Sequence, residues 1–328
     1  MKIQNTIWFL LCIFLLSPLL LAAGGQRETT AEPSAPVTIR LGGLRGPTSV
    51  ALAPYIIDGS RAGNDVTVTT ETYGSPDAAI GRLLAGEVDI AALPTNLASI
   101  LYNRDAGIQL LGVSGGGVLY VVADTDMDFS DIAGQTVHTI ARGATPDIML
   151  QTLAAGRGLQ AGVDYTIQYA ADQTELAQGL IAGRINLAVL PEPFVSRVTQ
   201  ANPELVIAID LQQLYREQYG SGYYPMTVLV VRNDFAKQHP QAVAAFSADI
   251  PRAQHWLNEN LATAAAAAGE TIGIPAAVIE ASYPRLNLTW VPADEAKPEV
   301  LRYLQVFSDF NPASVGGNLP GNDFFFRP

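Results

Sequence analysis

Hydrophobic and polar positions along the chain follow two recurring patterns, one typical of strands and one typical of helices. Residues 37–41 alternate between apolar and polar side chains, and residues 66–73 alternate again with threonines on one side. The first run ends in a glycine-bearing turn that leads into the apolar stretch 50–57. A strand, a tight turn and a helix in succession begin a βαβ unit. The pattern therefore predicts an α/β fold.

The first of these units is repeated later in the chain. Residues 45–99 resemble residues 142–196 without a gap, so that RGPT at 45–48 returns as RGAT at 142–145. A repeat distance near 100 residues has the size of a small domain and is too long for a solenoid. The sequence therefore predicts two similar α/β lobes that face each other, with a small-molecule site in the cleft between them.

Both copies carry the same signals at the ends of their second helix. Ser75 is placed to cap the helix of the first copy, and Asp172 followed by Glu175 has capping-box spacing in the second. Each helix ends at a glycine and is followed by a continuously apolar run, at 88–93 or 185–190. Such runs are typical of strands covered by helices on both faces. We therefore expect a mainly parallel sheet in each lobe.

The remainder of the chain has no partner in the duplicated pattern. Residues 109–113 and 119–122 are expected to add strands to the first lobe, and the mostly helical part after residue 225 is expected to return to it. The crossings near 123–127 and 223–227 would be hinges. This division assigns residues 37–123 and 227–328 to lobe 1 and residues 124–226 to lobe 2.

The last residues contain three consecutive phenylalanines, Phe324, Phe325 and Phe326, in a segment otherwise rich in Gly, Asn and Pro. Exposing so much apolar surface would lower solubility. We expect this segment to dock onto the body of the protein.

The N-terminal segment is typical of an export signal. Lys2 precedes the apolar stretch 7–21, and small residues follow it. Residues 1–24 are therefore predicted to be a signal peptide and residues 25–36 a polar tether; an uncleaved membrane anchor is the alternative, because the apolar stretch is nearly long enough to span a bilayer. Cys12 is preceded by leucines, which is unlike a lipoprotein signal.

Composition narrows the possible functions. Cys12 is the only cysteine, so a mature chain without its signal would hold no disulfide, thiolate metal site or cysteine nucleophile. The formal net charge is −12 and no basic cluster is present, which disfavours a nucleic-acid partner. Hydrophobic residues make up 48% of the chain, enough to build apolar cores for two lobes.

Ligands of open parallel sheets bind at the carboxyl ends of the strands, beside helix N-termini. Applied to both lobes, this rule predicts a ligand site with contributions from each copy. The predicted ligand-binding residues are Arg45, Thr48, Tyr73, Ser75, Thr95, Asn96, Ser114, Gly116, Arg142, Thr145, Glu192, Phe194 and Tyr224.

The chemistry of these residues leaves alternatives open. Thr48 and Thr145 lie where a hydroxyl and backbone N–H groups could receive an anionic or carbonyl group, or they only cap their helices. Arg45 and Arg142 could hold a sulfonate, phosphate or carboxylate, or pair with surface acids. Glu192, between two prolines, is predicted to contact the ligand or to act in lobe closure.

Catalytic chemistry has little support in the sequence. The three histidines are scattered, and neither metal-ligand spacing nor a nucleophile with a neighbouring base is present. The sequence therefore predicts a binding protein, with no catalytic residue, no metal and no cofactor.

Several motifs resemble one family. AGEVDIA at 85–91, DIAGQTV at 131–137 and PEPF at 191–194 resemble the substrate-binding proteins of ABC importers, in the branch that includes sulfonate, taurine, nitrate and thiamine-pyrimidine binders. The resemblance implies a two-lobed type II periplasmic-binding-protein fold with two hinge crossings. It also implies an exported, periplasmic monomer that captures a small organic nutrient and delivers it to a membrane permease.

The same branch supplies a rival hypothesis, a pyrimidine-synthase-like enzyme. Such an enzyme uses a lysine linked to pyridoxal phosphate, histidine chemistry and a cysteine-rich motif. Here Lys237 and Lys297 lie in the C-terminal helical part, outside the predicted cleft, and the cysteine motif is absent. An exported ligand sensor of the same fold is a third reading.

Overall fold

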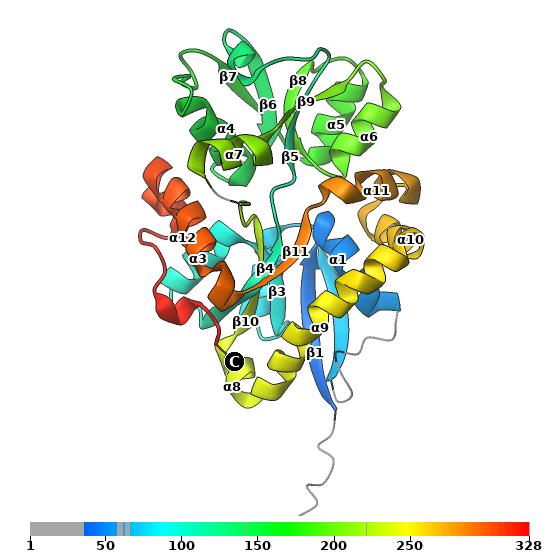
Figure 1. Cartoon of the computed structure of the whole chain (residues 1–328), viewed down its shortest axis with the longest axis vertical. Coiled ribbons are helices and arrows are strands. Elements are labelled where there is room, and N and C mark those ends of the chain that lie inside the picture. The colour runs from blue at the N-terminus through cyan, green and yellow to red at the C-terminus, as the bar shows by residue number, and fades with distance from the viewer. Residues whose placement is uncertain (1–35, 58–61, 63–65, 141, 221, 328) are drawn as a thin grey trace, which may run out of the picture. The chain divides into compact units, whose positions relative to one another are not determined.

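The computed structural model describes residues 36–57, 62, 66–140, 142–220 and 222–327. The predicted signal peptide, Cys12 and nearly all of the tether lie outside these residues. Both sheets described below belong to one unit, residues 35–328, and helices flank each of them (Figure 1).

The first sheet has six strands in the order β11-β4-β10-β3-β1-β2. β1 pairs in parallel with β2 and β3, whereas β10 is antiparallel to β3 and β4, and β11 is antiparallel to β4. The sheet is therefore mixed, and the mainly parallel pairing expected from the sequence holds only on its β3-β1-β2 side. Its strands are β1 (Val37–Leu44), β2 (Val66–Tyr73), β3 (Ile90–Pro94), β4 (Ile108–Gly115), β10 (Thr227–Arg232) and β11 (Leu288–Pro292).

The second sheet has five strands in the order β7-β6-β8-β5-β9. β6 pairs in parallel with β7 and β8, and β5 is antiparallel to β8 and β9. Its strands are β5 (Leu119–Ala123), β6 (Thr136–Ile140), β7 (Thr166–Ala170), β8 (Leu187–Pro191) and β9 (Val206–Asp210).

The duplication predicted from sequence is visible in the topology. β1, α1 (Pro47–Ile57), β2, α2 (Pro76–Leu84) and β3 form one unit, and β6, α4 (Thr145–Ala155), β7, α5 (Gln173–Ile181) and β8 form the other. In both sheets the third strand of the unit is flanked by an antiparallel strand, β10 or β5. In each sheet, the strand next to the repeated unit, β10 or β5, therefore comes from a part of the chain outside that repeat.

The predicted helix ends are confirmed. The Ser75 side chain accepts a hydrogen bond from the Ala78 N–H at 3.3 Å, and Asp172 accepts from the Thr174 and Glu175 N–H groups at 2.8 Å. Gly86 and Gly183, which follow these helices, have φ of 75° and 64°. Because L side chains rarely adopt such angles, glycine suits both positions.

Strand β5 belongs to the second lobe, whereas the sequence predicted it in the first. β5 pairs with β8 and β9 of the second sheet, so the sequence-based assignment of residues 119–122 to the first lobe is wrong. Its continuously apolar residues would suit either core, and only pairing with β8 selects the second. The chain consequently crosses between the sheets within residues 116–118 and returns within 220–226.

The two crossings pack tightly against each other at Gly117. Its N–H donates to Gln212 Oε1 at 2.7 Å, and a Cβ at this position would lie 2.0 Å from Tyr224 Cζ. Tyr224 is fully buried and stacks on Tyr303, with ring centroids 5.8 Å apart. Glycine is therefore required here by the close approach of the second crossing.

The C-terminal part completes the first sheet and also contacts helices of the second lobe. β10 and β11 complete the first sheet as expected, but α11 packs against α6 of the second lobe and α12 contacts α4. The remaining helices are α3 (Thr95–Asn103), α6 (Phe194–Ala201), α7 (Leu211–Tyr219), α8 (Asn233–Gln238), α9 (Pro240–Glu259), α10 (Leu261–Ile272), α11 (Ala276–Ser282) and α12 (Ala293–Phe310).

The three terminal phenylalanines are docked, as the sequence predicts. Phe324, Phe325 and Phe326 are all buried, and the Phe326 N–H donates to the Leu110 carbonyl at 2.9 Å. The end of the chain is thus held against β4. Within the described ranges no single helix has the length and apolar character to cross a membrane; the bent pair Leu261–Ile272 and Ala276–Arg285 meets the criterion only when taken together.

Candidate ligand-binding site

A cavity of about 270 Å³ lies where residues of both sheets converge. Three helices that follow strands of the first sheet (α1, α2 and α3) and two from the second (α4 and α5) contribute first-turn residues to its wall. We call this cavity the cleft. Its polar lining residues are Arg45, Thr48, Asn96, Thr145, Gln173 and Thr227.

Of the predicted ligand-binding residues, Arg45, Thr48, Asn96 and Thr145 line the cleft. Arg45 is the only charged residue among the described lining residues, and its guanidinium forms no ion pair with the described part of the chain. The cleft therefore carries a positive charge that no acidic lining residue offsets.

The threonines at the two helix starts differ in their contacts. The Thr48 hydroxyl accepts from the Leu44 N–H at 2.9 Å and donates to the Leu44 carbonyl, which closes the turn between β1 and α1. Thr145 is the first residue of α4 and is buried, and α4 receives no side-chain cap. α4 thus begins at the cleft, and its first-turn N–H groups receive no side-chain cap.

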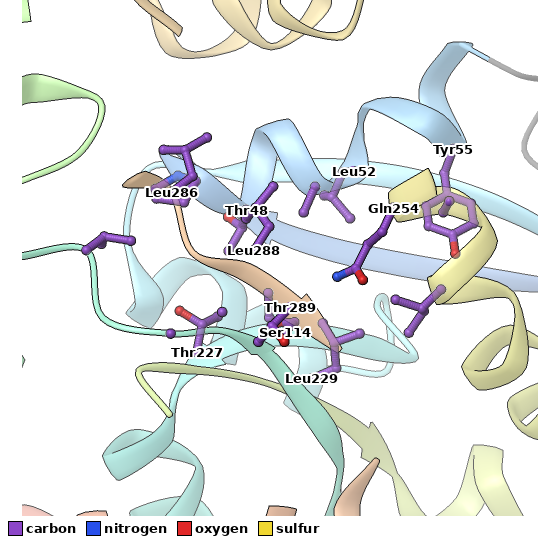
Figure 2. A pocket seen from close by; sticks show the side chains of 18 of the residues that line it. Thr48, Leu52, Tyr55, Ser114, Thr227, Leu229, Gln254, Leu286, Leu288 and Thr289 are labelled. Carbon is purple, nitrogen blue, oxygen red and sulfur yellow. The ribbon is translucent and has the colours of Figure 1, made fainter. Parts of the chain in front are cut away.

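A second, smaller cavity adjoins the cleft within the first lobe. It has a volume of about 50 Å³ and lies between α1, α9 and the strands β3, β4, β10 and β11. We call it the annex (Figure 2). Its wall is mostly apolar and includes Leu52, Tyr55, Leu229, Phe246, Ile250 and Leu288. Two further predicted site residues, Ser114 and Gly116, line the annex and not the cleft.

Three of the predicted residues have side chains engaged in local contacts beside the cleft. Tyr73 donates to Glu71 Oε2 at 2.9 Å. Burial of the hydroxyl is the main cause, and this hydrogen bond a smaller one, of a rise in the pKa of Tyr73 to about 12. Thr95 donates to the Pro225 carbonyl at 2.6 Å, which ties α3 to the second crossing. Ser75 caps α2. None of the three is a lining residue of the cleft.

Glu192 lies in a buried ion pair. It is fully buried, its Oε1 accepts from Arg285 Nε at 2.5 Å, and its Oε2 accepts from the Ser196 N–H at 3.0 Å. Arg285 also donates to Ser196 Oγ at 2.7 Å. Both carboxylate oxygens are thus occupied by protein donors, and the pair joins the start of α6 to the segment that precedes β11.

The two other aromatic site predictions, Phe194 and Tyr224, are buried in the protein interior. Phe194 packs in the apolar cluster beneath α5 and α6. Tyr224 packs against Tyr215 and Tyr303 and does not line the cleft. An aromatic residue in sequence does not reveal whether its ring faces a core or a ligand, which is why this part of the prediction differs from the structure.

A family scan matches residues 33–272 to the NMT1-like family. The chain belongs to this family. No curated protein sequence matches it significantly. Among solved structures, an ABC transporter protein from Parabacteroides distasonis is 28% identical, with a TM-score of 0.75, over 89% of this chain and 99% of that chain.

Two further structures resemble this NMT1-like chain in fold. The alkanesulfonate-binding protein SsuA from Xanthomonas axonopodis pv. citri, bound to MOPS, has a TM-score of 0.65 at 15% identity and covers 89% of this chain and 97% of its own. The periplasmic nitrate-binding protein NrtA from Synechocystis PCC 6803 has a TM-score of 0.64 at 15% identity, with coverage of 84% and 82%. The fold is the two-lobed one of periplasmic binding proteins.

Asp147 lies beside the cleft, at the start of α4, and was not predicted from the sequence. It is buried; its Oδ2 accepts from the Gly143 N–H at 2.6 Å, and its Oδ1 accepts from Tyr169 Oη and Gln151 Nε2, both at 2.7 Å. Burial is the main cause, and the hydrogen bond to Asp147 a smaller one, of a rise in the pKa of Tyr169 to about 12. An Asp as the third residue of a helix that begins Thr-Pro was the available signal.

Arg142 completes this group. Its guanidinium carbon lies 4.2 Å from the centroid of the Tyr169 ring, a cation–π contact. The side chain is exposed and is not among the cleft-lining residues. In the second lobe, then, the residues around Asp147 fix the loop before α4, and the arginine lies over an aromatic ring.

Proposed function

We propose that this NMT1-like protein is the solute-binding component of an ABC importer, which captures a small organic molecule between its two lobes and delivers it to a membrane permease. The observation that carries the proposal is the cleft, where first turns of helices from both lobes surround one cavity. A ligand that touches both lobes favours the closed arrangement by its differential affinity for the closed and open states. One similar solved structure, from Staphylococcus aureus, is named as the ligand-binding component of an ABC-type import system.

The ligand is proposed to carry an anionic group. Arg45 is a cation within a wall that has no described carboxylate, and the N-termini of α3 and α4 lack side-chain caps. A helix N-terminus carries partial positive charge and favours anions, and arginine forms forked contacts with carboxylate, sulfonate or phosphate. These features favour an acid over a neutral or cationic solute.

Binding without chemistry is the function that the cleft residues favour. The described lining of the cleft contains no histidine, lysine or carboxylate. No group of three or more metal-ligating side chains occurs in the described part of the chain. Lys237 lies in α8 and Lys297 in α12, neither in the cleft. We therefore favour a binding protein over the pyrimidine-synthase-like enzyme.

Export to the periplasm, as a monomer, belongs to the same proposal. Related binding proteins are named as periplasmic, and the N-terminal sequence has the pattern of a signal peptide. The soluble and the tethered forms differ only in whether this signal is cleaved.

Native mass spectrometry of the protein purified without refolding, followed by a thermal-shift screen of organic acids, tests the proposal. A ligand that binds only the folded state raises the melting temperature. We expect a co-purified acid, or a shift with members of the screen that Arg45→Gln reduces. Folded protein that carries no solute and responds to no acid would argue against solute capture and favour the sensor reading.

A further inference from the structure

The annex is a mostly apolar cavity next to the cleft, whose wall carries the cation Arg45. Figure 2 shows Leu52 from α1, Leu229 from β10 and Leu288 from β11 around the same space. Protein interiors contain few voids larger than one water molecule. A water occupies about 30 Å³ of the liquid, and the annex has about 50 Å³. The cavity is thus larger than an ordinary packing defect, and most of its wall is apolar.

The annex and the cleft meet at one short stretch of wall. Pro47, Thr48, Val118 and Thr227 line both cavities. Thr48 lies at the start of α1, and Val118 belongs to the first crossing between the sheets. A ligand whose polar group lies near Arg45 and Thr48 would therefore have its other end directed at the annex.

One polar atom in the annex has no partner. Ser114 Oγ is buried and makes no hydrogen bond to any described residue. Figure 2 shows Ser114 among the residues that surround the cavity. The buried hydroxyl is part of the annex wall.

We propose that the annex is a specificity subsite that receives a short alkyl group of the ligand, so that the solute is a small organic acid with an unbranched apolar end. This rests on the proposed function, because the acidic group is taken to lie in the cleft. The size of the annex favours an alkyl group over a ring. A cavity that holds benzene has about 150 Å³, three times the volume of the annex.

The test compares a series of straight-chain carboxylates, from acetate to octanoate, on the whole protein and on three variants. Ala253, which is buried on α9 and lines the annex, is changed to Leu to fill it. Leu288→Ala enlarges the annex. Ala248, exposed on the same helix and absent from the annex wall, is changed to Leu as the matched control.

For the unchanged protein and Ala248→Leu, we expect affinity by calorimetry to rise about fourfold with each added CH₂ until the annex is full. Ala253→Leu should abolish this rise but leave the affinity for acetate unchanged, and Leu288→Ala should move the optimum to a longer chain. Folding is checked by the thermal transition of each variant.

Two results would overturn the proposal. One is the same dependence on chain length in Ala253→Leu as in the unchanged protein, which would make the annex a packing void. The other is a lack of binding for every carboxylate. In that second case the proposed function is judged separately by native mass spectrometry, since a co-purified solute of another class would support capture while excluding the alkyl subsite.

Discussion

The two copies of the duplicated unit begin with nearly the same four residues but hold them differently. Residues 45–48 and 142–145 both start a helix at the cleft. Two positions further on, the first copy has Val50, buried in an apolar cluster, where the second has Asp147, which binds Gly143, Gln151 and Tyr169. The first loop is held by the Thr48 hydroxyl, and the second by a buried carboxylate.

The same contrast recurs after the third strand of each unit. The side chain of Thr95 in the first copy makes one hydrogen bond, to the Pro225 carbonyl. The equivalent residue of the second copy is Glu192, which pairs with Arg285 from outside the repeat. The duplication thus supplies the frame of both lobes. At these two positions the second copy has a buried carboxylate, Asp147 or Glu192, where the first copy has Val50 or Thr95.

The largest predicted effect comes from breaking the buried pair. Arg285→Met should leave the Glu192 carboxylate buried without its cation, and we expect a loss of about 3 kcal/mol in the free energy of unfolding, at the lower end for buried pairs, because the Arg285 side chain is 34% exposed. Urea denaturation measures it. Thr95→Val, the matched change in the first copy, should cost only about 1 kcal/mol. Equal losses of stability in the two variants would show that the buried ion pair contributes no more than a neutral hydrogen bond.

A smaller loss is predicted for Asp147→Ala. The change leaves the Gly143 N–H and the Tyr169 hydroxyl without their acceptor, which should lower stability by about 2 kcal/mol. Hydrogen exchange offers a local readout, because the Gly143 amide should exchange faster in the variant. Asp147→Asn retains an acceptor and should restore part of the protection. A Gly143 amide that exchanges at the original rate in Asp147→Ala would mean that the carboxylate does not hold the loop.

The arginines of the two copies should differ in their effect on ligand affinity. Arg45→Gln should weaken binding of the solute identified by mass spectrometry by about tenfold or more, the scale of one charge-assisted hydrogen bond. Arg142→Gln should weaken ligand binding by less than about threefold, because the Arg142 guanidinium lies over the Tyr169 ring and not in the cleft wall. An exposed cation–π contact of this kind is worth about 0.5–1 kcal/mol. Calorimetry on both variants decides. Equal weakening would place the two arginines in equivalent roles.

Much of this architecture is predictable because its signals are local. The caps at Ser75 and Asp172 and the glycines after both helices are read from a few adjacent residues, and the duplication repeats them. The placement of β5 is not local: residues 119–123 are apolar and would suit either sheet, and only their pairing with β8 decides. Helix capping and strand periodicity carry no information about such long-range pairing.

The site residues show the same difference between local signals, which can be predicted, and long-range contacts, which cannot. Arg45, Thr48, Asn96 and Thr145 follow from the rule that ligands lie beyond strand ends, and the structure brings them to one cavity. The partner of Glu192 is 93 residues away in sequence, and nothing near Glu192 points to Arg285. Tyr224 illustrates the opposite problem, because a residue near a crossing was expected to face the cleft and instead fills the space left by Gly117.

The smallest predicted effect concerns alkaline pH and compares the tyrosines beside the two loops. Burial raises the pKa of both Tyr73 and Tyr169 to about 12, with added contributions from Glu71 and Asp147 respectively. A group whose pKa is higher in the folded than in the unfolded state stabilises the fold fully below its unfolded pKa, near 10 for tyrosine, and loses that stabilisation as the pH rises towards 12. Stability should therefore fall between pH 10 and pH 12.

Replacing either tyrosine by phenylalanine separates the two contributions. Tyr169→Phe and Tyr73→Phe should each make the fall in stability between pH 10 and pH 12 shallower, and the double variant should flatten it further. Arg142 lies over the Tyr169 ring and favours its ionised form. Arg142→Gln should therefore shift the midpoint of Tyr169 ionisation, followed by ultraviolet difference absorption, to higher pH. A midpoint that does not move would mean that the guanidinium leaves the ring in solution, and the second loop would then resemble the first in having a free arginine.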